Sequence, residues 1–110
     1  MTINDEGRQV QIAEQLSETA RTLAHSTRNV PECADSYALL GDLSASLWAL
    51  GQVADQLGRW HANEGAGSAE RRACEAVEAH LRTAADLLRN AGEHLDQAHT
   101  ANGRIRWRSQ

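Results

Sequence analysis

The stretch from Asp35 to Ala62 constrains the fold of this chain most, because apolar residues recur along it at helical spacing. The main apolar line alternates steps of three and four residues, the spacing of a heptad seam: Leu40, Leu43, Leu47, Leu50, Ala54 and Leu57. Leu39, Val53 and Trp60 widen this line on one side. An apolar arc wider than a single surface helix needs predicts a helix that packs against further helices.

Two further helices are predicted on either side of this stretch. The first runs roughly from Asp5 to His25, with a cap at Thr2, Asn4 or Asp5 and an apolar stripe of Ile12, Leu16 and Leu23. The third follows a turn at 63–68, has Ser68 as its N-cap and ends at a C-cap formed by Asn102 and Gly103. Its apolar seam is regular: Cys74, Val77, Leu81, Ala84, Leu88, Ala91, Leu95 and Ala98.

Short connections make consecutive helices antiparallel neighbours. The predicted fold is therefore all-α, an antiparallel up-down-up three-helix bundle over residues 1–102, followed by a short basic tail at 103–110. Helix rise gives the long third helix about 50 Å and the first about 30 Å. The surplus length predicts either an overhanging end that pairs with another chain or a dimer built from longer hairpins.

Charge and composition narrow the classes of function. Residues 1–102 hold eight of the eleven basic residues and all fifteen acidic ones, a net charge of −7, which argues against general nucleic-acid binding by this part of the chain. All basic residues are arginine and phenylalanine is absent, a composition typical of a GC-rich bacterial genome. The sequence has no apolar run long enough for a membrane span, and its N-terminus is polar. Both features predict a cytoplasmic protein.

Residues capable of chemistry are present but poorly spaced for it. The chain has no C-x-x-C or H-x-x-x-H pair, and Cys33 and Cys74 are expected at opposite ends of the bundle. His25, Cys33 and His99 form the one grouping suited to a transition metal. His61 beside Cys74 is the one nucleophile–base pair. Nothing fixes the geometry of either group, so we predict no catalytic site, no cofactor and no metal.

A line on the second helix that contains three glycines and two aromatic residues is the first candidate binding surface: Tyr37, Gly41, Ser44, Trp48, Gly51, Asp55 and Gly58. Each glycine inside a helix costs about 0.8–1 kcal/mol relative to alanine, so three of them indicate a close approach by another element. That element could be the first helix. It could equally be a partner helix, with Trp48 as its anchor and Tyr37, Gly51 and Gly58 beside it.

The C-terminal tail is the second candidate. Arg104, Arg106 and Arg108 alternate with Ile105 and Trp107, a pattern that suits phosphate contacts with base stacking, an added strand or an anionic membrane surface. It also suits a tail that folds back on the acidic bundle. The sequence therefore predicts a non-enzymatic interaction module that binds itself, as a homodimer, or a partner helix. The alternative is a nucleic-acid-binding accessory protein that uses Arg104, Arg106, Trp107 and Arg108.

Overall fold

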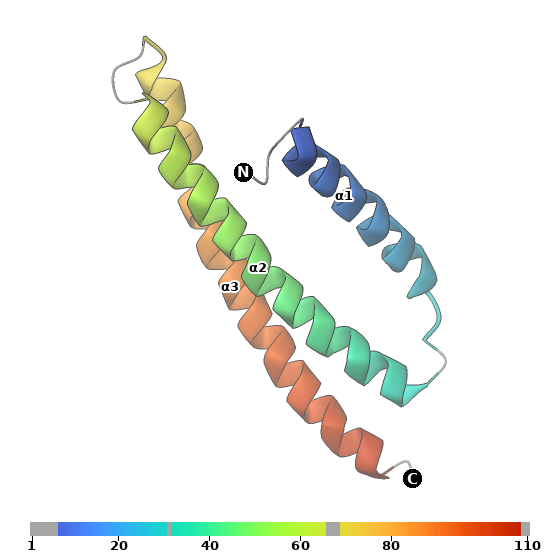
Figure 1. Ribbon diagram of the computed structural model, residues 1–110. Coiled ribbons are helices and arrows are strands. Elements are labelled where there is room, and N and C mark those ends of the chain that lie inside the picture. Colours follow the sequence, from blue (N-terminus) through green and yellow to red (C-terminus); the bar gives the residue numbers. More distant parts are fainter. Residues whose placement is uncertain (1–6, 31, 66–68, 109–110) are drawn as a thin grey trace. The chain divides into compact units, whose positions relative to one another are not determined.

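A computed structural model describes residues 7–30, 32–65 and 69–108, and every regular element in this part of the chain is an α-helix (Figure 1). The helices are α1 (Arg8–Ser26), α2 (Cys33–Gly65) and α3 (Arg71–Arg108). The predicted all-α fold with three helices is confirmed. The chain divides into two compact units, Met1–Glu32 and Cys33–Gln110, and each is described by itself.

The first unit contains α1. Gly7 precedes the helix with φ 74°, a left-handed conformation that glycine adopts without strain. The carbonyl of Leu23 accepts hydrogen bonds from the backbone N–H of Thr27 at 2.9 Å and from the Thr27 hydroxyl at 3.0 Å, which satisfies the end of the helix. Ile12 and Leu16 are 48% and 46% exposed, so their stripe is only partly covered.

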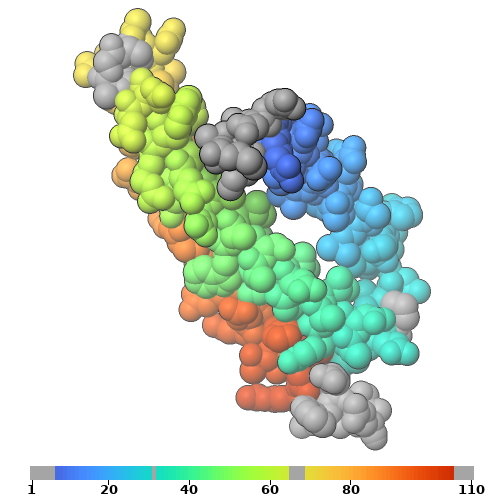
Figure 2. Space-filling view, in the orientation of Figure 1, coloured from blue at the N-terminus to red at the C-terminus, as the bar shows by residue number. Residues whose placement is uncertain are grey.

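The second unit is an antiparallel hairpin of α2 and α3, which lie against each other along their length (Figure 2). The most buried positions at their contact are small: Ser44, Ala54 and Ala85 are 2%, 7% and 0% exposed, and Gly51, Gly58 and Gly92 are also buried. We call this contact the seam. It consists of Tyr37, Gly41, Ser44, Trp48, Gly51, Ala54, Asp55 and Gly58 on α2 and Glu78, Leu81, Ala85, Arg89, Gly92, Asp96, His99 and Gly103 on α3.

Large side chains lie over glycines of the opposite helix along the seam. A Cβ added to Gly103 would lie 3.1 Å from Tyr37 Cε1, and one added to Gly92 would lie 3.0 Å from Trp48 Nε1. In the reverse direction, His99 of α3 packs over Gly41 of α2, where an added Cβ would lie 3.1 Å from the imidazole Nε2. Glycines are therefore needed on both helices for this close approach.

Polar contacts across the seam fix the register of the hairpin. The buried Ser44 hydroxyl has two acceptors within hydrogen-bond distance for its single hydrogen, the Gly92 carbonyl oxygen at 3.0 Å and Asp96 Oδ1 at 2.6 Å. Arg89 forms an ion pair with Asp55, with Nη1 and Oδ2 2.7 Å apart. Sliding one helix along the other would separate both pairs and leave the Ser44 hydroxyl without its acceptors, which is costly at a buried position.

The seam corrects the prediction of which residues would face each other. The leucine-rich heptad line of the second helix is predicted at the centre of the fold, and its member Ala54 is buried there. Leu57 of the same line is 48% exposed, however, and Val53, which widens the line, is 47% exposed. On α3 the most buried positions are Ala85 and Gly92, each one residue after a position of the predicted seam. Small residues form this contact because they allow the two backbones to approach more closely than leucines do.

The predicted C-cap at Asn102 and Gly103 is also wrong, because α3 continues to Arg108. Two contacts with α2 hold the chain helical at this point. Asn102 Nδ2 donates to Ser36 Oγ at 3.1 Å, and the Tyr37 ring covers Gly103. The other helix ends lie up to three residues from their predicted positions. Thr2, Asn4, Asp5 and Ser68, the predicted N-terminal caps, lie outside the described residues.

Candidate interaction surface

An apolar surface formed jointly by α2 and α3 is the candidate site. We call it the leucine face, and it consists of Leu43, Leu47, Leu50 and Leu57 on α2 and Val77, Ala84, Leu88, Ala91 and Leu95 on α3. Each of these nine residues directly precedes a residue of the seam, and Leu88 Cβ would also lie 3.8 Å from a Cβ added to Gly51. One residue is a rotation of about 100°. In an antiparallel pair, the same offset on both helices places all these side chains on one side of the hairpin.

The leucine face is incompletely covered in the structure. Leu57 and Val77 are 48% and 38% exposed, Ala91 is exposed, and the remaining leucines are half-buried. Within the described residues, the hydrophobic side chains classed as buried are Ala54 and Ala85 alone. Two alanines provide little apolar burial for a hairpin of this length, so apolar area of the leucine face is still available for burial. Other large hydrophobic side chains of the hairpin are exposed outside this face, among them Trp48, Val53, Trp60 and Leu87.

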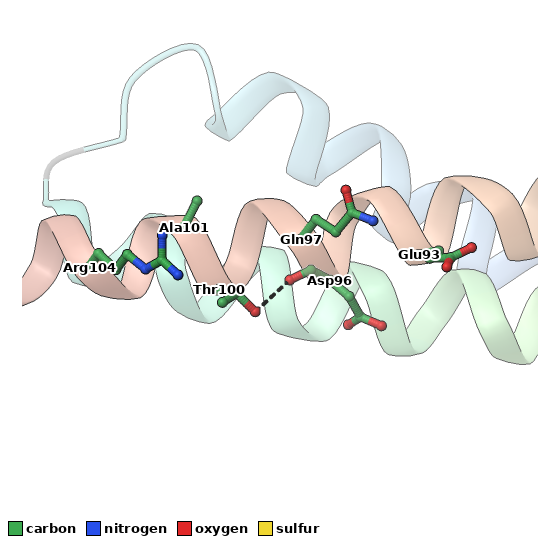
Figure 3. Close-up of a pocket in the computed structure, with 6 residues that line it drawn as sticks. All are labelled: Glu93, Asp96, Gln97, Thr100, Ala101 and Arg104. Atoms are coloured by element: carbon green, nitrogen blue, oxygen red, sulfur yellow. Dashed lines mark hydrogen bonds between the residues drawn. The ribbon is translucent and has the colours of Figure 1, made fainter.

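The opposite side of the hairpin is polar. The residues that directly follow seam positions are mostly polar or charged, among them Gln52, Asp86, Glu93 and Gln97, and the others are alanines such as Ala45. A hollow of about 450 Å³ on this side is lined by six residues of α3 (Figure 3): Glu93, Asp96, Gln97, Thr100, Ala101 and Arg104. A smaller hollow of about 200 Å³ lies between the helices beside Gly58 and Asp55. The hairpin therefore has one apolar and one charged side.

The charged side is organised around Arg89. Its guanidinium donates to Asp55 Oδ2 at 2.7 Å and to Asp86 Oδ1 at 2.8 Å. The hydrogen bonds to Asp55 and then to Asp86 raise the pKa of Arg89 above its already high value. The arginine is therefore charged at every working pH, and the group is an ion-pair network that joins the helices rather than a proton-transfer site.

The residues predicted to bind a partner lie on the seam. Gly51 and Gly58 are buried against α3: an added Cβ would lie 3.2 Å from Arg89 Cγ and 3.6 Å from Leu81 Cβ, respectively. The element that the glycines accommodate is thus α3, which neither of the two sequence-based interpretations named. Trp48 keeps 42% of its surface exposed, and Tyr37 stacks on His99 with ring centroids 4.0 Å apart. A contact of these two aromatic side chains with a partner stays a prediction.

The basic tail belongs to α3. Arg104 is exposed and lines one end of the hollow whose other end is lined by Glu93 (Figure 3). The side chains of Arg106, Trp107 and Arg108 lie outside the described residues, although the backbone there is helical. A helical backbone does not suit the added strand considered above. Binding of nucleic acid through these residues stays a prediction.

Two of the groups considered for metal binding lie at contacts between α2 and α3. Cys33 lies 3.9 Å from Asn102 Oδ1, and His99 stacks on Tyr37. His25 belongs to the other unit. Both cysteines are free thiols, and in the described part of the chain no three His, Cys, Asp or Glu side chains come together in an arrangement that could hold a metal ion.

The leucine face could have been found from the sequence. Its residues on both helices had been recognised as heptad lines, but each line was assigned to the contact between helices. The glycines of α2 already indicate a close approach by another element, but the sequence analysis did not connect them with Gly92, which identifies α3 as that element. A second apolar line beside such a contact is then a surface that remains to be covered.

None of the described helices combines the length and the hydropathy that crossing a membrane requires. No protein-family model matches the chain, and no curated protein or solved structure is significantly similar to it.

Proposed function

We propose that this protein is a non-enzymatic interaction module whose binding surface is the leucine face. The observation that carries the proposal is the distribution of apolar surface on the hairpin. Its closest contact is made by glycine, serine and alanine, whereas the large aliphatic side chains lie beside it and remain partly exposed. Contiguous exposed apolar surface that is bordered by polar residues is typical of protein–protein contact sites.

The shape of this surface suits a helical partner. Nine side chains on two parallel rows of a helix pair form an elongated apolar strip, the kind of surface that accepts the apolar face of another helix or helix pair. Arg89, Asp55 and Asp86 are engaged with one another on the other side, so they hold the hairpin together rather than contact a partner. Free thiols at Cys33 and Cys74 suit a reducing compartment such as the cytoplasm.

The proposal is tested by affinity capture from the cells that make the protein, with two matched variants as bait. Leu50→Glu places a charge in the leucine face. Ala45→Glu places the same charge at an exposed position that follows Ser44, on the polar side of the hairpin. We expect the wild type and Ala45→Glu to capture a partner that Leu50→Glu does not capture. An endogenous copy of this chain counts as such a partner. Equal capture by both variants contradicts the proposal.

A further inference from the structure

We infer that the occupant of the leucine face is a second copy of this chain, so that two hairpins pack face to face into a four-helix assembly. This inference rests on the proposed function and names the partner. Three properties of the face support it: its size, its lack of charge and its width.

The size of the face matches that of a stable interface. From Val77 to Leu95 the face is about 27 Å long, and two helices side by side are about 20 Å wide, which gives a flat footprint of roughly 550 Å². Two copies together would bury about 1,100 Å² by this measure, before the relief of the side chains is counted. Stable protein–protein interfaces bury about 1,200–2,000 Å² in total, so the face is large enough when its relief is included.

The lack of charge makes the face complementary to itself. A two-fold axis brings a patch against its own copy, so that any charge near the axis meets a like charge. The nine residues of the leucine face are leucine, valine and alanine only. The charged groups of the hairpin, including Arg89, Asp86 and Glu93, lie at the seam or on the polar side instead.

The width of the face favours a pair of helices over a single one. A single helix is about 10 Å across, about half the width of the face, so it could lie between the two rows and contact both but would leave their outer sides in water. A second hairpin presents two rows at the same spacing. The resulting four-helix arrangement surrounds both rows with apolar side chains, as in other antiparallel bundles.

The test is the molar mass of the full chain, measured by light scattering and sedimentation equilibrium over a wide concentration range. We expect twice the chain mass of 12.0 kDa for the wild type and for Ala45→Glu. Leu50→Glu should weaken the dimer about a hundredfold or more, because it buries a carboxylate opposite its own copy. Circular dichroism verifies that each variant is helical. If Leu50→Glu does not fold, Leu57→Glu replaces it, because Leu57 is nearly half exposed within one hairpin.

Two outcomes overturn the inference. A wild type of 12.0 kDa at all concentrations excludes a second copy; if the capture experiment still finds a partner that Leu50→Glu loses, the proposed function stands with a different occupant. A dimer that survives Leu50→Glu and dissociates with Leu16→Glu, a matched change in the exposed stripe of α1, assigns the contact to α1. A wild-type monomer combined with equal capture by both baits contradicts both proposals.

Discussion

Replacing Gly58 with alanine should stabilise the protein, although Gly58 is buried between two helices. A Cβ at this position would lie 3.6 Å from Leu81 Cβ and 3.9 Å from the Glu78 carbonyl oxygen, which are ordinary van der Waals distances. A hollow of about 200 Å³ lies beside it. The methyl group therefore fits without movement of either helix.

The size of the effect follows from two contributions. Alanine is favoured over glycine inside a helix by about 0.8–1.0 kcal/mol. Burial of the added methyl group contributes at most about 0.8 kcal/mol more. We expect a gain of about 1–1.5 kcal/mol in the free energy of unfolding, which raises the Tm of a chain of this size by roughly 4–6 °C.

Gly92→Ala is the matched comparison. Its Cβ would lie 3.0 Å and 3.1 Å from Nε1 and Cδ1 of the Trp48 indole, which is tighter than most side-chain contacts, so the indole must shift by a few tenths of an ångström and loses part of its packing on α3. The loss of this packing should offset the gain in helix propensity and leave Gly92→Ala no more stable than the wild type.

Urea and thermal unfolding, followed by circular dichroism at one fixed protein concentration, measure both effects. A Gly58→Ala protein that is less stable than the wild type would refute the spacing of the helices at this point. Equal stabilisation by the two variants would refute the packing of Trp48 over Gly92.

Three further predictions concern the polar groups and the tail. Ser44→Ala should lower the free energy of unfolding by about 1–2 kcal/mol in urea titrations, because Asp96 and the Gly92 carbonyl lose a buried hydrogen-bond donor; an unchanged stability would show that water replaces the hydroxyl. Arg89→Met should lower the Tm at low ionic strength and much less at about 1 M salt, where ion pairs are screened. Because the pKa of Arg89 is raised, the stabilisation by its ion pairs should persist up to strongly alkaline pH and be lost only as the pH rises through the pKa of Arg89 in the folded protein. If the tail binds nucleic acid, fluorescence titration with single-stranded DNA should give binding that weakens with salt and is reduced in the Arg104→Gln variant, whereas salt-independent binding would contradict this use of the tail.

Helical periodicity was sufficient to predict the three helices, because each carries a long apolar pattern and is separated from the next by a strong turn signal. It was not sufficient to predict which side of each helix faces its neighbour. Leu50 and Gly51 are adjacent in the sequence, and both belong to lines with heptad spacing. Hydrophobicity favours the leucine line, but the distance of closest approach between backbones favours the glycine line, and this distance decided the contact.

The end of α3 shows the same limit for local signals. Asn102 and Gly103 form a good helix stop when only neighbouring residues are considered. In the fold, Asn102 bonds to Ser36 and Gly103 lies under Tyr37, and both partners are more than sixty residues away in the sequence. Contacts of that kind cannot be recognised until the register of α2 and α3 is known.

The alternation of large residues and glycines along the seam also restricts how this sequence can evolve. Trp48 and Gly92, or His99 and Gly41, share the space of one side chain, so a larger residue on one helix must be accompanied by a smaller one on the other. Relatives of this protein should exchange such pairs together. The double substitution Trp48→Gly with Gly92→Trp should be tolerated better than Gly92→Trp alone. Paired changes of this kind would identify a distant relative even where overall sequence similarity is low.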